Sequence, residues 1–321
     1  MINANNLRIS LDRRSKGSDL DFISHAHADH ISSAKSTKHA IASEETVALL
    51  KKINDIELKH EKTPDFMQLY DAGHILGSKQ IAINDEVSGR RILYTGDFQL
   101  QNGRACKKLQ ITGADTIIVD STYFDPRIKF DERSEVEIAI QKWTQGKLRN
   151  GIALFSTFAL GKAQELIMIL NEVGIVPVVS EKIARINEVY AHCGLDLDYI
   201  ADYEDGAEYI QLLKENFVGI TDGPGDQIRA CVSEAYGKRV YSAVATGFSK
   251  VMKFNTDVQF SLSDHADFWQ AYDYIGMTGA KNVLTYGPNA VQMAINLSRN
   301  GCGAEPYAEA AVTQQMATLI K

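Results

Sequence analysis

The segment HAHADH, which begins at His25 and directly follows the apolar stretch at 20–24, leaves few folds open to this chain. Residues two apart in an extended segment point the same way, so His25 and His27 can face one point. A turn after them would bring Asp29 and His30 to a neighbouring position. Imidazole nitrogens and carboxylate oxygens are ligands that suit zinc, and also manganese or iron. The pattern therefore predicts a metal site at the end of a buried strand and disfavours a polar loop with chance histidines.

Two later segments each offer one more ligand. His74 lies in AGHILGS after a predicted strand, where the flanking glycines permit a tight turn and a close approach to a bound group. Asp97 ends the apolar stretch RRILYTGD, where a carboxylate is well placed to bridge two ions. Taken alone, His74 would more often be structural, and Asp97 would be a turn residue that caps the next segment. Beside HAHADH, both are predicted ligands of one metal centre.

Short strands dominate the hydrophobic pattern in the first part of the chain. A helix is predicted within 31–52, where AIASEETVALLKK has an apolar stripe and a start at Ser43 or Glu44. The turn EVSG joins two of the predicted strands as a hairpin. The strands are predicted at 7–12, 20–24, 67–71, 80–85, 90–97 and 116–122.

Strands and helices alternate in the middle of the chain. A helix is predicted at 133–149, followed by strand, turn and helix in GIALFSTFALGKAQELIMILNEVG and by the strands VPVVS and RVYSAVAT. This alternation favours a parallel sheet in an inserted domain. From VQFSLSDHAD the chain returns to strand, polar loop and helix, with a strand at 282–288 and a helix at 289–300.

The composition is that of a soluble protein with one large domain or two. The chain has 321 residues, of which 45% are hydrophobic and 23% charged. It has no run of about 18 apolar residues, so no membrane span is expected, and MINANNLRIS lacks the features of a secretory signal. The four cysteines lie far apart, which disfavours a cysteine zinc finger or a disulfide framework and favours a cytoplasmic location. The formal net charge of -7 gives no bulk basic surface, although a local groove can still bind nucleic acid.

HAHADH, AGHILGS and YTGDF, in this order, resemble the motifs of the metallo-β-lactamase superfamily. Further segments resemble motifs of its β-CASP branch, whose members process nucleic acids. These are Asp120 in VDSTY, the segment FSTFALGKAQE, and SLSDHAD, which is centred on His265. The matches cover nearly the whole chain. The SDHAD form and the short length resemble the compact archaeal and bacterial members, which are mRNA 3′-end processing factor-like proteins and ligase-associated DNA exonucleases.

The resemblance implies an α/β fold, a four-layer αβ/βα sandwich with the metals at its rim and an inserted β-CASP-like α/β domain. The expected domains are a first metallo-β-lactamase part at 1–125, the insert at 126–257 and a metallo-β-lactamase return segment at 258–321.

The resemblance also assigns the metal ligands. One zinc would be held by three histidines, the second by the aspartate and histidine that follow in HAHADH, and one carboxylate would bridge them. The residues are His25, His27 and His74 for the first ion, Asp29 and His30 for the second, and Asp97 as the bridge. Asp12 resembles an early aspartate that orients ligands from behind, with a surface aspartate as the alternative.

One position departs from the family pattern. The last motif usually ends a strand with a histidine and a glycine, and that histidine is a ligand of the second zinc. Here Tyr286 precedes Gly287, and a neutral phenol, with a pKa near 10, is a poor zinc ligand. One or two zinc ions are therefore expected, with the second site weak.

The chemistry that follows is hydrolysis by a metal-activated hydroxide near Asp97. His265 is the predicted proton donor to the leaving oxygen, and Asp120 would hold its other ring nitrogen; the alternative is a histidine that merely caps a helix. A substrate phosphate could rest at the start of the helix after FSTF, where simple capping is the alternative. The residues predicted to bind it are Ser156, Thr157 and Lys162.

These interpretations combine into a zinc-dependent hydrolase, a nuclease that cleaves phosphodiester bonds of RNA or single-stranded DNA in RNA processing or DNA repair. RNA or single-stranded DNA is the expected partner, without membrane association, and a homodimer is left open. Two alternatives remain. One is a zinc hydrolase of small substrates such as a β-lactam, a lactone or an ester, because the metal site alone does not determine the substrate. The other is a catalytically weakened RNA-processing subunit.

Overall fold

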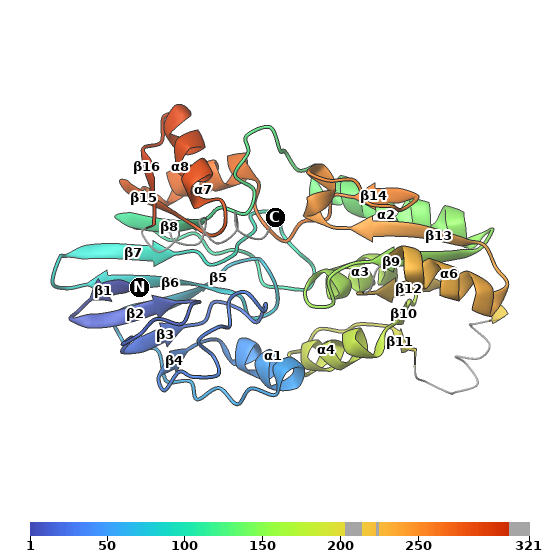
Figure 1. Ribbon diagram of the computed structural model, residues 1–321, viewed down its shortest axis with the longest axis horizontal. Coiled ribbons are helices and arrows are strands. Elements are labelled where there is room, and N and C mark those ends of the chain that lie inside the picture. Colours follow the sequence, from blue (N-terminus) through green and yellow to red (C-terminus); the bar gives the residue numbers. More distant parts are fainter. Residues whose placement is uncertain (203–213, 223–224, 308–321) are drawn as a thin grey trace. The chain divides into compact units, whose positions relative to one another are not determined.

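The computed structural model describes residues 1–202, 214–222 and 225–307. Within them the chain forms two compact units (Figure 1). Unit 1 comprises Met1–Lys129 together with His265–Lys321, and unit 2 comprises Phe130–Asp264. No helix in the described residues is long and apolar enough to cross a membrane.

Unit 1 contains two sheets, one of four strands and one of six. In the smaller sheet the order is β1-β2-β3-β4, and only the β1–β2 pair is antiparallel; the strands are β1 (Ile2–Ala4), β2 (Leu7–Leu11), β3 (Leu20–Phe22) and β4 (Ala40–Ile41). In the larger sheet the order is β16-β15-β8-β7-β6-β5, and β6 runs antiparallel to both of its neighbours, β5 and β7. The strands are β5 (Met67–Asp71), β6 (Lys79–Asp85), β7 (Arg90–Tyr94), β8 (Thr116–Asp120), β15 (Asn282–Tyr286) and β16 (Ala304–Pro306).

The central strands β6 and β8 of the larger sheet are buried on both faces, and their side chains alternate between the two faces. Ile81 and Ile83 of β6 belong to the core cluster that includes Ile9 and Phe22 of the smaller sheet. Ala82, between them, belongs to the opposite core, which is completed by helices α7 (Phe268–Thr278) and α8 (Ala290–Arg299). Two facing sheets with helices on the outer face agree with the predicted sandwich.

Helix α1 (Glu44–Asn54) begins where the sequence predicts it. The Ser43 side chain caps the helix by accepting a hydrogen bond from the Thr46 backbone N–H at 3.1 Å. The helix does not extend back to residue 31, because residues 32–36 form turns and β4 follows. Residues 32–39 are mostly polar and have no apolar stripe that a helix could bury.

Unit 2 contains a six-stranded sheet in which every pairing is parallel, as the alternating pattern predicts. Its order is β11-β10-β12-β9-β13-β14, formed by β9 (Ile152–Ser156), β10 (Val178–Val179), β11 (Ile200–Ala201), β12 (Val218–Thr221), β13 (Val240–Ala245) and β14 (Val258–Phe260). The described residues of unit 2 also form the helical elements α2 (Arg133–Leu148), α3 (Lys162–Asn171), α4 (Glu181–His192), α6 (Gly225–Tyr236) and the short η1 (Gly247–Lys250).

The boundary after unit 2 lies later than the sequence predicts. Because β14 pairs with β13, residues 258–264 belong with unit 2, whereas the return segment was expected to begin at 258. That unit 2 is the β-CASP-like insert remains a prediction.

Candidate metal centre

The three segments that carry predicted ligands each follow a strand of unit 1. HAHADH comes after β3, AGHILGS after β5, and the segment with Asp97 after β7. Two glycines make the turns possible: Gly73 has φ +74° and Gly96 has φ +54°, values that side-chain-bearing residues rarely adopt. The ends of β3, β5 and β7 therefore bring His25, His27, His74 and Asp97 close together.

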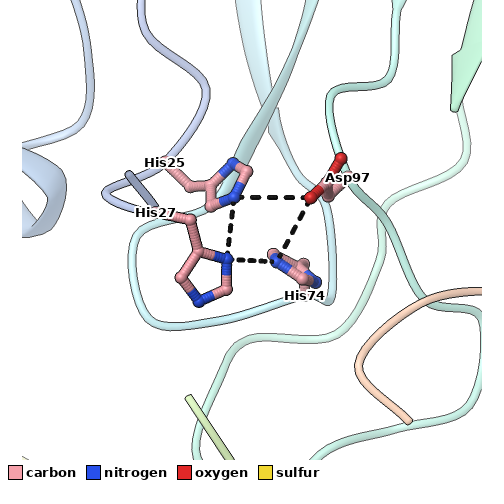
Figure 2. A group of neighbouring side chains, drawn as sticks. All are labelled: His25, His27, His74 and Asp97. Carbon is pink, nitrogen blue, oxygen red and sulfur yellow. Dashed lines mark hydrogen bonds and ion pairs between the residues drawn. The ribbon is translucent and has the colours of Figure 1, made fainter. Parts of the chain in front are cut away.

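Four of the predicted ligands meet in one cluster (Figure 2). His27 Nδ1 lies 3.1 Å from His25 Nε2 and 3.0 Å from His74 Nε2. Asp97 Oδ2 lies 3.5 Å from His25 Nε2 and 3.6 Å from His74 Nε2. His25, His74 and Asp97 are buried, and His27 is half-buried.

This donor set fits a divalent metal. His27 Nδ1 lies close to two other ring nitrogens, and one proton on it could form a hydrogen bond with only one of them. A cation at the centre of the cluster would instead accept the lone pairs of all three nitrogens and of the Asp97 carboxylate. Burial, with the positive potential of His30, His74 and His27, holds the pKa of His25 well below its usual value despite the opposing Asp97 carboxylate. His25 is therefore neutral, the form that binds metals. Three imidazoles and one carboxylate are a donor set that zinc accepts.

Asp12 supports this cluster from behind. It is 0% exposed and follows β2 in a left-handed conformation with φ +57°. Its carboxylate accepts hydrogen bonds from Ser24 N at 2.6 Å and Ser24 Oγ at 2.7 Å. It also contacts His30 Nδ1 and Tyr94 Oη, each at 2.7 Å. The alternative of a surface aspartate is therefore wrong, and Asp12 is at the centre of a buried network.

The network also orients the histidines. Because the Ser24 hydroxyl donates to Asp12, it is free to accept from His25 Nδ1, which lies 2.9 Å away. That arrangement leaves the lone pair of His25 Nε2 facing the cluster. Sequence reasoning did not single out Ser24 or Tyr94, although the position of Ser24 directly before HAHADH is a signal that could have identified it.

His30 and Asp29 lie beside the four-residue cluster. His30 Nε2 is 3.3 Å from Asp97 Oδ2 and 3.6 Å from Asp29 Oδ2, and the Asp29 side chain is 79% exposed. Burial alone would lower the pKa of His30, but the Asp97 and Asp12 carboxylates outweigh it and hold that pKa well above the usual value. The assignment of Asp29 and His30 to a second metal remains a prediction.

A second group shares Asp97 and adds Asp120 and His265. His265 Nδ1 lies 3.1 Å from Asp120 Oδ2, and its Nε2 lies 3.8 Å from Asp97 Oδ2. Asp120 Oδ1 accepts from the Thr122 backbone N–H at 3.0 Å and from its hydroxyl at 2.8 Å. His265 and Asp120 lie 145 positions apart in the sequence, and the structure places them in contact. Their catalytic roles remain predictions.

The alternative that His265 merely caps a helix does not fit the geometry. Helix α7 is capped by Asp267, whose side chain accepts from the Gln270 backbone N–H at 2.9 Å. The His265 ring instead lies against the His74 ring, with their centroids 4.6 Å apart. It is therefore part of the surroundings of the metal cluster.

Tyr286 lies within the core between the two sheets of unit 1. Its hydroxyl donates to the Leu11 carbonyl at 3.4 Å, and its ring packs edge-on against Tyr94 with centroids 5.3 Å apart. Burial, together with the Asp12 carboxylate, raises the pKa of Tyr286 to about 12. The phenol is therefore neutral near pH 7, the form that binds zinc poorly.

The predicted phosphate-binding residues lie in unit 2. The Thr157 backbone N–H donates to the Thr221 carbonyl at 2.9 Å, because the sheet pairing continues past the end of β9. Thr157 Oγ1 donates to the Ala245 carbonyl at 2.9 Å. Lys162 is buried, and its ammonium pairs with Asp264 at 2.7 Å. Substrate binding by Ser156, Thr157 and Lys162 remains a prediction.

Replacing Gly96 with alanine is expected to destabilise unit 1. A Cβ at this position would lie 2.7 Å from Ser24 Cβ, and the positive φ adds strain. We expect the free energy of unfolding to fall by about 2 kcal/mol or more, measured by urea denaturation. Gly89→Ala is the matched control, since Gly89 has φ +66° but no atom within 4 Å of an added Cβ. Equal losses in both variants would exclude the contact with Ser24.

Comparison with known proteins finds no matching family model, but it finds several relatives. The chain is 26% identical over 298 residues to the "Probable DNA ligase" of Opitutus terrae. It is 30% identical over 207 residues to the "Probable RNase MJ4" of Methanocaldococcus jannaschii, and 38% identical over 111 residues to the "Cleavage and polyadenylation specificity factor subunit 3" of Dictyostelium discoideum. These relatives are members of the β-CASP branch of the metallo-β-lactamase superfamily, some of them ligase-associated.

The similarity covers these β-CASP relatives only in part. It spans 88%, 51% and 32% of this chain, but only 28%, 48% and 13% of the ligase, the RNase and the specificity factor. The chain thus covers less than half of each of these three relatives. A solved structure, titled "Crystal Structure of a Protein of Unknown Function from Enterococcus faecalis V583", has a TM-score of 0.58 at 14% identity and covers 92% of this chain and 81% of its own. That likeness supports the fold alone.

Proposed function

We propose that this chain belongs to the β-CASP branch, as its relatives do, and that it is a metal-dependent nuclease that cleaves phosphodiester bonds of RNA or single-stranded DNA. The observation that carries the proposal is the proximity of two groups around Asp97. On one side are the three histidines of the metal cluster, and on the other is the His265–Asp120 pair. A metal site next to an oriented acid–base histidine is what hydrolysis of a bond with a poor leaving group needs.

Zinc is the metal we propose for the cluster, held by His25, His27, His74 and Asp97, because three imidazoles with one carboxylate suit it. A second ion would depend on Asp29, His30 and the shared Asp97. We propose that this second site is weak. Asp29 is largely exposed, and Tyr286 is buried as a neutral phenol at the position where a further histidine is expected.

The zinc, when bound, supplies a water whose pKa is lowered to about 7. His25, His27, His74 and Asp97 would fix its position through the Asp12 network behind them. In the reaction the oxygen of the attacking water bonds to phosphorus and the bond to the leaving oxygen breaks. His265, protonated on Nε2 and oriented through Nδ1 by Asp120, donates the proton that makes the leaving group a neutral hydroxyl. The proton lost by the water passes to solvent.

Two points favour nucleic acid over a small substrate. A nucleotide alkoxide is a poor leaving group, so it needs the proton donor that the His265–Asp120 pair would supply. The names of two relatives describe an RNase and a cleavage and polyadenylation factor. A cytoplasmic location is also part of the proposal, because none of the four cysteines forms a disulfide, as is usual in a reducing compartment.

The test combines metal analysis with a cleavage panel of labelled RNA, labelled single-stranded DNA and a chromogenic β-lactam. We expect about one tightly held zinc per chain and cleavage of at least one nucleic acid, with removal of the metal by a chelator abolishing it. His27→Ala should lose the metal and at least about a hundredfold in rate. His39→Ala is the matched control, because the His39 side chain is exposed and its ring pairs with the Glu61 carboxylate.

Two outcomes would overturn the proposal. Purified protein that stays free of metal when zinc is supplied would exclude the metal centre. A protein that binds zinc and hydrolyses the β-lactam, while it leaves both nucleic acids intact, would identify a hydrolase of small substrates instead.

A further inference from the structure

Gln99 lies two residues after Asp97, and its buried side chain contacts the loop that carries His265. Its amide nitrogen donates to the backbone carbonyl of His265 at 2.6 Å. Its amide oxygen accepts from the Gln101 backbone N–H at 3.0 Å. The side chain is thus held at one end by its own segment and at the other by the backbone of the proposed proton donor.

The backbone around Gln99 joins the same segments. Gln99 N–H donates to the Ala72 carbonyl at 3.0 Å, directly before the turn to the ligand His74. The packing there is tight, since a Cβ on Gly73 would lie 2.4 Å from the Gln99 carbonyl oxygen. One residue earlier, the Phe98 carbonyl accepts from the Ala266 backbone N–H at 2.8 Å.

These contacts form a two-point clamp on the His265 loop, made by the Gln99 side chain and the Phe98 carbonyl. The clamp joins the segment with Asp97 to the segment with His265, and the Gln99 backbone N–H joins the same residue to the segment with His74. We propose that Gln99 is a positioning residue that fixes His265 relative to Asp97 and Asp120. This proposal rests on the proposed function, in which His265 protonates the leaving oxygen.

The need for such a clamp follows from the geometry of the His265 ring. Its Nδ1 contact with Asp120 restrains the rotation of the ring, but the distance of Nε2 from Asp97 depends on where the backbone of residue 265 lies. A short hydrogen bond to the carbonyl of that residue restrains the backbone directly. Displacements of about 1 Å in a reacting group are enough to lower a rate by about a hundredfold.

The test compares two phosphodiesters with different leaving groups. RNA or single-stranded DNA releases an alkoxide that needs a proton, whereas bis(p-nitrophenyl) phosphate releases p-nitrophenolate, which leaves without one. We expect Gln99→Met to lower kcat on the nucleic acid by about 10- to 100-fold, with KM and zinc content unchanged. On bis(p-nitrophenyl) phosphate the loss should stay within about twofold. Equal losses on both substrates would overturn the proposal.

Gln141→Met is the matched control. Gln141 also donates its amide N–H to a backbone carbonyl, that of Ile169 at 2.9 Å, but it lies in unit 2. Both substrates should be hydrolysed by this variant at the wild-type rate. If Gln99→Met does not fold, Gln99→Glu is measured on the same two substrates with the same expected result. It keeps the size of the side chain and the acceptor for the Gln101 N–H, but it loses the amide N–H that donates to the His265 carbonyl.

Hydrogen exchange separates this proposal from the proposed function. Gln99→Met should exchange the Ala266 amide at least about tenfold faster than wild type, because the clamp on the loop is lost, whereas Gln141→Met should not. Unchanged exchange would overturn the clamp, whatever the activity. Faster exchange in a protein that hydrolyses neither phosphodiester would support the clamp and overturn only the proposed nuclease function.

Discussion

Asp97→Ala is expected to reduce hydrolysis of every substrate by about a thousandfold or more, the largest effect of any single change in this protein. The reason is the position of one oxygen. Asp97 Oδ2 lies within 3.6 Å of His25 and His74 in the metal cluster and 3.3 Å from His30. The same oxygen lies 3.8 Å from His265 Nε2, so its loss affects the metal site and the proposed proton donor together.

The measurement is the initial rate on RNA, single-stranded DNA and a chromogenic β-lactam, with zinc content determined on the same samples. Asp97→Asn keeps the shape of the side chain and removes its charge, so a similar loss in this variant would assign the effect to the carboxylate. Asp273→Ala, at an exposed position of α7, is the control and should keep the wild-type rate. Wild-type hydrolysis by Asp97→Ala would show the mechanism proposed here to be wrong.

Asp12→Ala is expected to lower both stability and metal affinity. The substitution leaves the buried Ser24, His30 and Tyr94 without the acceptor that they share. Removing one member of such a buried network costs about 3–5 kcal/mol of unfolding free energy. Because the network also orients His25, we expect the affinity for zinc to fall by about 10- to 100-fold.

Urea denaturation of the metal-free protein measures the first effect of Asp12→Ala, and competitive zinc titration measures the second. Asp12→Asn is the informative companion, since asparagine also tolerates the left-handed backbone with φ +57°. It should therefore unfold at a higher urea concentration than Asp12→Ala while it still binds zinc more weakly than wild type. Wild-type stability in Asp12→Ala would mean that the network contributes nothing measurable.

The elements of the fold were largely predictable, because they depend on local patterns of apolar residues. The strands of both units that follow apolar runs are present, and so is the α1 start at Ser43. The misjudged parts are those in which tertiary pairing decides. β14 belongs with unit 2 because it pairs with β13, and the part of the predicted helical stretch 31–52 that precedes Ser43 forms turns and β4.

The candidate site was predictable where its residues form motifs. His25 and His27 lie in one short segment, and His74 and Asp97 follow strands next to glycines, so residue type and local context together suggested ligands. Residues that support the site only by hydrogen bonds to other residues could not be identified in the same way. Gln99 carries no motif of its own, and Asp12 was weighed against a surface position although it is fully buried.

The metal-binding chemistry follows from local sequence, because the imidazoles and carboxylates of HAHADH, AGHILGS and YTGDF can bind a metal once they lie close together. How close they lie depends on the fold. The strand ends bring His27 within 3.1 Å of His25 and within 3.0 Å of His74. The same packing encloses Tyr286 as a neutral phenol between the sheets and takes up the Thr157 N–H in the sheet of unit 2. Burial and hydrogen-bond partners are properties of segments distant in sequence, so no local pattern could supply them.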